Sequence, residues 1–399
     1  MNEMLNRTPN GMKDLLLREC EINREISTRL FDFFSKRGYH EVITPVLEYF
    51  DLFNLPSSDF TQEEIYKSTD FDNRLLALRP DMTMPIARLS ATRLRDERLP
   101  LRLFYNQKVF RLNRNLKGHR NEINQAGIEL IGEKGVLSDL EIISYAFGAL
   151  QTCGIDYFAI EIGHAGIFKK LAEKLPVDKR RREQIRKLIE SKNYSALDDE
   201  LTKIGDTGLA RDLKMLPRLF GGSEVFDVAE QLYGSIISDE ITYLKEIYSS
   251  LSIVFGDKIR VDLGLVHRNN YYSDIVFRGY ITGSGTTVVS GGRYDNLFDD
   301  LDCDLPAIGF AVDVDAICDI LLANENRCEK SPDMLIFAVN GYEMKALEYM
   351  NECIKNGMTC EILGLVDADS AERLARDRGV GFSIVGSDIT VSKAERFVL

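Results

Sequence analysis

The stretch from Val261 to Phe298 constrains the fold more than any other part of this chain. It contains three consecutive strand-like runs: Val261–Val266, Tyr271–Thr282, and a polar run that ends in Gly-Gly-Arg-Tyr-Asp. Paired tyrosines, a turn rich in Gly, Ser and Thr, and a double glycine place side chains and open backbone against something small and polar. The stretch therefore predicts a pocket on the surface of a sheet.

A catalytic pocket of this kind is expected to carry a cation in its middle. The sequence there is His267-Arg268-Asn269-Asn270. The segment Gly291-Gly292-Arg293 is expected to turn and to form part of the pocket wall.

Composition sets the broad class. The chain has 399 residues, of which 44% are hydrophobic and 28% charged, which is typical of a soluble globular protein with two domains or one large insertion. Its net charge of −13 disfavours non-specific binding to nucleic acid. Seven cysteines without CxxC spacing argue against zinc and fit reduced thiols. Because the sequence shows no signal peptide or membrane-length apolar run, we expect a cytoplasmic protein.

Two β runs, Arg102–Phe110 and Glu122–Ile131, flank a polar loop. In the second run, Gln125 and Glu129 are four positions apart and so share one face of the strand. A buried carboxylate is costly unless it is paired or bound to a ligand. An acid and an amide on one face could hold an amine or an imidazole, although a solvent-facing side of a sheet would show the same pattern.

Residues 167–250 are charged and mostly helical in pattern, which predicts an insertion between two parts of one sheet. Its basic helix face, Lys179–Arg182 with Arg186 and Lys187, could touch RNA or an acidic partner. A solvated surface is the commoner outcome for such a face. His164, before the insertion, is expected to be a turn or cap residue.

The C-terminal part divides at a polar segment. Residues 323–333 include a proline and predict a linker, and residues 334–399 alternate strands with helices. This alternation predicts a small α/β domain with a largely parallel sheet.

Six phrases together resemble the histidyl branch of the class II aminoacyl-tRNA synthetases over nearly the whole chain. GYHEVITPVLEYFDLF looks like motif 1, LALRPDMT is similar to the segment LRPEGT, and VFRLNRNLKGHRNEINQAGIELIG looks like motif 2. LVHRNNYYSDIVF resembles the histidine-specific segment LVRGLDYY, and GGRYDNLF with PAIGFAVDVDAI resembles the region through motif 3. Their order and spacing match those of the family.

The resemblance implies an α+β fold, in which helices flank an antiparallel class II sheet. It implies a synthetase-like domain at 1–322 that contains the helical insertion at about 167–250, then the linker at 323–333. The unit at 334–399 resembles the anticodon-binding domain, and we expect it to be truncated, with its final strand and helix shortened or missing.

Departures from the family pattern fall on the positions that handle ATP. By resemblance, Arg111 is the motif 2 arginine that binds the α-phosphate. Asn113 stands where the family has a glutamate, and Asn121 stands where it usually has a further arginine. His267 stands where LVRGLDYY has its arginine, and Ala316 stands where motif 3 has the arginine for the γ-phosphate. A histidine lacks the permanent charge and the bidentate fork of a guanidinium. Since adenylation depends on preorganised cations, these positions predict a chain that is not an enzyme.

The positions that hold histidine in the family are filled by residues of the right kind. By resemblance, Arg111 would hold the carboxylate of the ligand. An acid, a threonine and the motif 2 glutamine would hold the α-amino group, and the motif 2 glutamate with the second tyrosine of the pair would hold the imidazole. The expected pocket residues are Asp81, Thr83, Arg111, Gln125, Glu129, Tyr271 and Tyr272. Asp81 is one methylene shorter than the glutamate of the family.

This combination is similar to the synthetase paralogues that serve as regulatory subunits of ATP phosphoribosyltransferase, in the first step of histidine biosynthesis. The resemblance implies a short catalytic subunit as partner, commonly in a hetero-octamer, self-dimerisation through the motif 1 region, and L-histidine as the effector of feedback inhibition. It implies no tRNA, membrane, metal or cofactor. Two alternatives stay open: a divergent histidyl-tRNA synthetase, and an RNA-binding module that senses uncharged tRNA.

Overall fold

The structure is a computed structural model of the whole chain. It divides into two compact units, residues 1–324 and 325–399, which are described separately. The residues described are 6–58, 60–113, 120–205, 208–266, 271–283, 285–324, 331–364 and 367–392.

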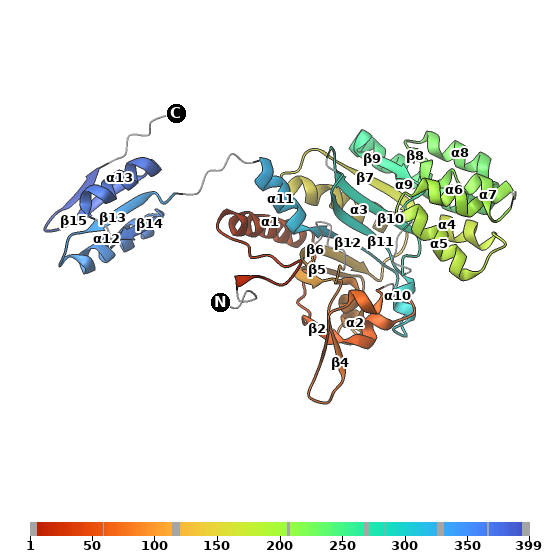
Figure 1. Cartoon of the computed structure of the whole chain (residues 1–399), viewed down its shortest axis with the longest axis horizontal. Helices are drawn as coiled ribbons and strands as arrows, with labels where there is room; N and C mark the ends of the chain where they lie inside the picture. Colours follow the sequence, from red (N-terminus) through yellow and green to blue (C-terminus); the bar gives the residue numbers. More distant parts are fainter. Residues whose placement is uncertain are drawn as a thin grey trace. The chain divides into compact units, whose positions relative to one another are not determined.

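A nine-stranded sheet forms the centre of the first unit (Figure 1). Its strand order is β1-β5-β6-β12-β11-β10-β7-β9-β8, and the six strands from β5 to β7 in this order pair antiparallel. At the two ends, β1 pairs parallel with β5 and β9 parallel with β7. The strands are β1 (His40–Glu41), β5 (Leu101–Phe110), β6 (Glu122–Ile131), β7 (Phe158–His164), β8 (Phe220–Gly221), β9 (Ile259–Asp262), β10 (Ile275–Ile281), β11 (Thr287–Arg293) and β12 (Ala307–Asp313).

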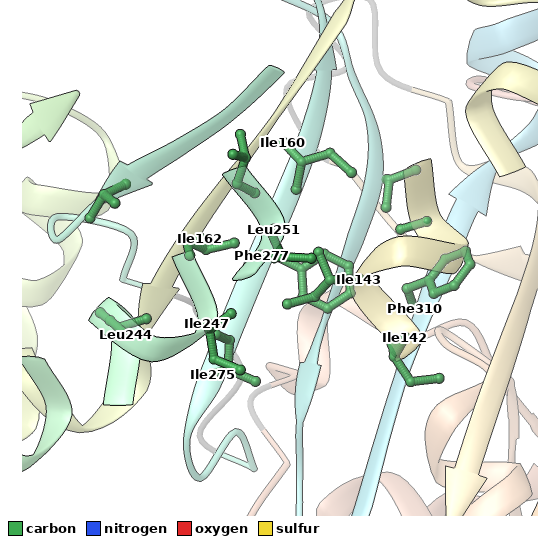
Figure 2. Close-up of a cluster of buried hydrophobic side chains, with 14 of the residues drawn as sticks. Ile142, Ile143, Ile160, Ile162, Leu244, Ile247, Leu251, Ile275, Phe277 and Phe310 are labelled. Carbon is green, nitrogen blue, oxygen red and sulfur yellow. The ribbon is translucent and has the colours of Figure 1, made fainter. Parts of the chain in front are cut away.

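One face of this sheet carries the main hydrophobic core. Helices α1 (Arg18–Ser35), α3 (Val136–Thr152) and α11 (Val314–Asn324) pack there, and Figure 2 shows Ile142 and Ile143 of α3 close to Phe277 and Phe310 of the sheet. The alternation of β6 explains the partition, because side chains on a strand point to opposite faces in turn. The β6 side chains in this core are Ala126, Ile128 and Leu130.

The opposite face carries a second core cluster, which includes buried Met84 and Ile86 of helix α2 and Leu297 of helix α10. Around it lies a three-stranded sheet in the order β2-β4-β3. Gln125, Gly127 and Glu129 of β6 alternate with the residues in the main core, so the pattern places them on this second face. The elements are β2 (Leu47–Tyr49), β3 (Lys67–Thr69), β4 (Leu75–Leu78), α2 (Thr83–Thr92) and α10 (Asn296–Asp299).

Between β7 and β9 the chain forms a helical insertion. His164 caps its first helix, since its Nδ1 accepts a hydrogen bond from the backbone nitrogen of Gly166 at 3.0 Å. The insertion helices are α4 (Ala165–Glu173), α5 (Lys179–Glu190), α6 (Tyr194–Thr202), α7 (Gly208–Leu213), α8 (Glu224–Tyr233) and α9 (Ser238–Phe255). The 3₁₀ turns of the unit are η2 (Phe50–Asn54), η3 (Gln62–Glu64), η4 (Leu216–Arg218), η5 (Gly234–Ile236) and η6 (Gly256–Lys258).

Three of the six basic residues on the face of α5 form ion pairs with carboxylates, namely Arg181, Arg186 and Lys187. Arg181 lies 2.8 Å from Glu200, and Arg186 lies 2.7 Å from Glu183. A cation that is already paired with a carboxylate at the surface attracts a polyanion such as RNA only weakly, because its charge is neutralised by its partner and screened by salt. The structure therefore favours the solvated interpretation of this face.

Three expected boundaries in the stretch 261–298 are wrong. The strand expected at Tyr271–Thr282 begins only at Ile275, and the run expected at Val261–Val266 ends as a strand at Asp262, where the backbone turns at Gly264. The segment Gly291-Gly292-Arg293 is not a turn, because all three residues belong to β11. Residues 267–270, which include His267, lie outside the described residues.

The second unit contains a four-stranded sheet in the order β14-β13-β15-β16. β13 pairs parallel with β14 and β15, and β16 adds antiparallel, as the largely parallel pattern predicted. Its elements are β13 (Met334–Ala338), α12 (Glu343–Lys355), β14 (Cys360–Leu363), α13 (Ala368–Arg378), β15 (Gly381–Val385) and β16 (Ile389–Ser392). Among the helices described in either unit, none is long and apolar enough to cross a membrane.

Gly309 of β12 lies opposite Glu129 of β6, and a Cβ added there would lie 1.8 Å from Glu129 Oε2. We predict that Gly309→Ala lowers the free energy of unfolding by about 1–3 kcal/mol. The added methyl group would clash with the Glu129 side chain and also with the backbone oxygen of Ile128, which cannot move aside easily. Gly208→Ala at the start of α7 is the control, because nothing lies within 4 Å of its Cβ position. Urea unfolding followed by circular dichroism measures both, and equal stability of the two variants would contradict the prediction.

Candidate functional site

All seven expected pocket residues line one cavity on the second face of the main sheet. Asp81 and Thr83 come from the start of α2, Gln125 and Glu129 from β6, and the tyrosine pair from the segment before β10. The full lining is Asp81, Met82, Thr83, Tyr105, Arg111, Gln125, Glu129, Tyr271, Tyr272, Ser290, Gly291, Tyr294, Gly309, Phe310 and Ala311.

Glu129 is the most buried of the acids in the cavity, with 1% of its surface exposed. Its Oε2 accepts a hydrogen bond from the hydroxyl of Tyr294 at 2.6 Å, and its Oε1 accepts one from Thr83 at 3.2 Å. Burial raises the pKa of the Glu129 carboxyl to about 8, and the two hydrogen bonds oppose this shift only in part. The side chain is thus fixed in orientation and costly to ionise while the pocket is empty.

Asp81 is the second buried carboxylate, 5% exposed. Its Oδ1 accepts a hydrogen bond from the backbone nitrogen of Met84 at 3.1 Å, while its Oδ2 has no hydrogen-bond partner in the described part of the chain. Burial raises the pKa of Asp81 to about 6. A buried oxygen without a partner is unfavourable in isolation, so a cationic donor in the cavity would be stabilised there.

Tyrosines form the remaining walls. The ring centroids of Tyr271 and Tyr272 are 4.8 Å apart, and those of Tyr271 and Tyr294 are 6.1 Å apart. Sequence analysis missed Tyr294 and Tyr105, both of which are buried. Tyr294 could have been found, because it stands next to the double glycine in the motif GGRYDNLF. Tyr105 could have been found from the strand period, since it faces Gly127 across the β5–β6 pair.

Arg111 is the one cation among the described residues that line the cavity. Its Nε donates a hydrogen bond to the backbone oxygen of Pro80 at 2.7 Å, which ties the guanidinium to the loop that carries Asp81. The guanidinium carbon also lies 5.9 Å from the ring centroid of Phe60. Arg111 therefore stands at the boundary of the pocket in a fixed position, as a carboxylate-binding group would.

Of the segment 291–293, which was expected to form part of the pocket wall, Gly291 lines the cavity and Arg293 does not. The side chain points to the opposite face of the sheet, where its Nη2 lies 2.5 Å from Asp139 Oδ1 and 2.8 Å from Ser138 Oγ in α3. Both members of the Arg293–Asp139 pair are almost fully buried. The strand period is the reason, since Arg293 and Tyr294 are consecutive and point to opposite faces.

A larger cavity of about 850 Å³ adjoins the pocket and shares Arg111 and Gln125 with it. Its lining includes Asn113 and Ala316, two of the positions at which the sequence departs from the synthetase pattern. Its size is sufficient for a nucleotide.

Three aspartates and two arginines are the charged residues in the described lining of the larger cavity. Arg120 lies 2.7 Å from Asp319 and 3.4 Å from Asp315, so it is already engaged by two carboxylates. The third acid, Asp313, accepts a hydrogen bond from the backbone nitrogen of Ala316, and burial raises its pKa to about 6. Among these described residues, carboxylates outnumber guanidinium groups, which does not favour a polyphosphate.

Asn121, at the other position that departs from the family, is a buried structural residue. Its Nδ2 donates to the backbone oxygen of Asn10 at 3.0 Å and to the hydroxyl of Tyr66 at 3.1 Å, and its Oδ1 accepts from the backbone nitrogen of Asn113 at 2.9 Å. The side chain fastens the N-terminal segment to the strand end and carries no charge. In the described ranges no group of three His, Cys, Asp or Glu side chains is arranged to hold a metal ion.

The raised pKa of Glu129 predicts a pH dependence of stability for the ligand-free chain. The folded state keeps a proton on Glu129 up to about pH 8, whereas the unfolded chain releases it near 4.5. Stability therefore falls as pH rises through this window, by about 1 kcal/mol per pH unit for this group. Unfolding of wild type and Glu129→Gln at pH 6, 7 and 8 tests this: the wild-type curve should fall more steeply, and parallel curves would refute it.

Comparison with known proteins shows the family to which the chain belongs. A family model described as histidyl-tRNA synthetase matches residues 11–317. An ATP phosphoribosyltransferase regulatory subunit from Clostridium kluyveri is 38% identical over 383 residues, 94% of this chain and 97% of the relative. One from Bacillus mycoides is 39% identical over 79% of this chain and 76% of its own length.

Solved structures show the same fold. A protein from Bacillus halodurans, described as an ATP phosphoribosyltransferase regulatory subunit/histidyl-tRNA synthetase, superposes with a TM-score of 0.83 at 28% identity, over 96% of this chain and 98% of that one. A histidyl-tRNA synthetase from a Nostoc species, 16% identical, has the same fold with a TM-score of 0.78 over 98% of this chain and 97% of its own. With the synthetase-type pocket, the altered ATP positions and relatives of near-equal length, the chain belongs to the family of ATP phosphoribosyltransferase regulatory subunits, which share the fold of histidyl-tRNA synthetase.

Proposed function

We propose that this chain is a non-catalytic regulatory subunit that binds L-histidine and is required by a short ATP phosphoribosyltransferase subunit for activity and for feedback inhibition. One observation carries the proposal: a complete amino-acid pocket adjoins a nucleotide-sized cavity whose described charges are unsuited to ATP. The pocket supports recognition, and the cavity beside it opposes reaction.

The pocket offers a partner for each polar group of histidine. Asp81, Thr83 and Gln125 suit the α-ammonium group, because an amide, a hydroxyl and a carboxylate oxygen without a partner can accept its hydrogen bonds. Arg111 suits the α-carboxylate. Glu129 suits the imidazole, since a carboxylate buried among tyrosines gains most from a basic aromatic ring.

Adenylation needs cations, and the described residues around the larger cavity offer few to a polyphosphate. Arg120 is held by Asp315 and Asp319, and Ala316 has no charge. Removing one preorganised charged group commonly slows such a step by about two to three orders of magnitude. With His267 also lacking a permanent charge, we infer that the site forms no aminoacyl-adenylate.

The motif 1 region supports the proposed self-dimer. Ile43 is 78% exposed, and Val46, Leu47 and Tyr49 beside it are also exposed. Apolar side chains gathered along one edge are typical of a surface covered by another subunit. We propose that dimers of this kind join short catalytic subunits in a cytoplasmic hetero-oligomer, commonly an octamer, without tRNA.

A divergent histidyl-tRNA synthetase is the second candidate, favoured by the match of residues 11–317 to the synthetase family model. The two candidates differ in whether ATP is used. Both include a histidine pocket, so histidine binding alone does not separate them.

Reconstitution tests the regulatory role. We predict that adding this chain to a short catalytic subunit from the same organism raises phosphoribosyltransferase activity by at least about tenfold, and that L-histidine then inhibits the complex through linkage between the two binding events. The control is the catalytic subunit with histidine but without this chain. If the activity and its inhibition are the same with and without the chain, the regulatory role is wrong.

A substitution tests the pocket separately. We predict that Glu129→Gln weakens histidine binding roughly 100-fold in calorimetry, because a buried charged hydrogen bond is lost, while assembly with the catalytic subunit persists. Glu122→Gln on the same strand is the matched control, since Glu122 lies outside the pocket and pairs with Lys108. Unchanged affinity in the Glu129 variant would place the effector site elsewhere.

A further inference from the structure

We propose that the helical insertion responds to the occupancy of the pocket through Asp139, a positioning residue that joins the back of the pocket to α9. The inference rests on the proposed function, since it takes the pocket to bind histidine. It concerns a chain of buried contacts that starts at Glu129 and ends at Tyr243 in the insertion.

The first link runs from the pocket to β11. Tyr294, which donates its hydroxyl hydrogen bond to Glu129, follows Arg293 directly. The backbone oxygen of Arg293 accepts a hydrogen bond from Ser273 at 2.8 Å, next to Tyr272. The ring of Tyr272 lies so close to Gly292 that a Cβ there would be 2.8 Å from it. Two pocket walls therefore rest on the backbone of residues 292–294.

The second link crosses the sheet. The Arg293 side chain donates to Asp139 Oδ1 from Nε at 3.0 Å and from Nη2 at 2.5 Å, and its Nη1 lies 3.3 Å from Asp295. Arg293 and Asp139 have 2% and 1% of their side chains exposed. A buried ion pair is held by close geometry and is weakly screened. A displacement of Arg293 in β11 would therefore also displace Asp139 in α3.

The third link enters the insertion. The other oxygen of Asp139, Oδ2, accepts a hydrogen bond from the hydroxyl of Tyr243 in α9. The Tyr243 ring meets the ring of His164, the cap of α4, edge-on at 6.0 Å. One carboxylate thus holds the back of the pocket with one oxygen and the insertion with the other.

Ligand binding would disturb this series of contacts first at Glu129. A cationic or imidazole ligand competes with Tyr294 and Thr83 for the oxygens of Glu129, so Tyr294 must adjust when the pocket fills. Because Tyr294 and Arg293 are adjacent in the chain, that adjustment bears on Arg293, Asp139 and Tyr243 in turn. Differential contact of this kind is the physical requirement for coupling between two sites.

Hydrogen exchange on the full chain, with and without L-histidine, tests the inference. We expect the amides of α9 in wild type to exchange at least about twofold more slowly when histidine is bound. Tyr243→Phe should bind histidine within about threefold of the wild-type affinity in calorimetry and lose the response of α9. Tyr248→Phe on the same helix, whose ring packs against Phe226, is the control and should keep the response.

The outcomes separate the two proposals. If calorimetry detects no histidine binding to wild type, the proposed function fails. If histidine binds but exchange in α9 does not change, or if Tyr243→Phe responds like wild type, the coupling through Asp139 is overturned. If Tyr243→Phe does not fold, hydrogen exchange of α9 in the wild type with and without histidine is sufficient to test the coupling.

Discussion

The buried carboxylate of Glu129 is the group on which the site depends. It lies on a face of the sheet where a charge is costly, and the hydrogen bonds from Tyr294 and Thr83 to its oxygens offset that cost only in part. The space it occupies exists because Gly309, its neighbour on β12, has no side chain. These two hydrogen bonds fix the orientation of the carboxyl group before any ligand binds, which is the kind of preorganisation that lowers the cost of binding.

The neighbouring cavity is the basis for the proposal that this chain binds histidine without activating it. Recognition of histidine uses short-range groups that surround a small pocket, whereas adenylation adds the need to gather negative charge in one place. In this chain Arg120 is occupied by Asp315 and Asp319, and Asn121 serves to anchor the N-terminal segment. The two sites share Arg111, which is consistent with a guanidinium that holds the ligand carboxylate alone.

Local patterns predicted much of this architecture. The period of β6 placed Gln125 and Glu129 on one face, and the resemblance brought together pocket residues that are up to 191 positions apart, Asp81 and Tyr272. The orientation of Arg293 was wrong, because a glycine pair suggested a turn where the register continues a strand. Its partner Asp139 lies in a helix 154 positions away, and no local pattern reports such a contact. The strand expected at Val261–Val266 ends early because the backbone turns at Gly264, and the period of the side chains does not reveal such a turn.

The central claim is that the site recognises histidine and does not activate it. Histidine-dependent exchange of pyrophosphate into ATP, measured on protein saturated with L-histidine, tests this most directly. The account predicts no exchange above the level of a sample without protein. Exchange at a rate typical of a synthetase would contradict it and would establish the chain as an active histidyl-tRNA synthetase.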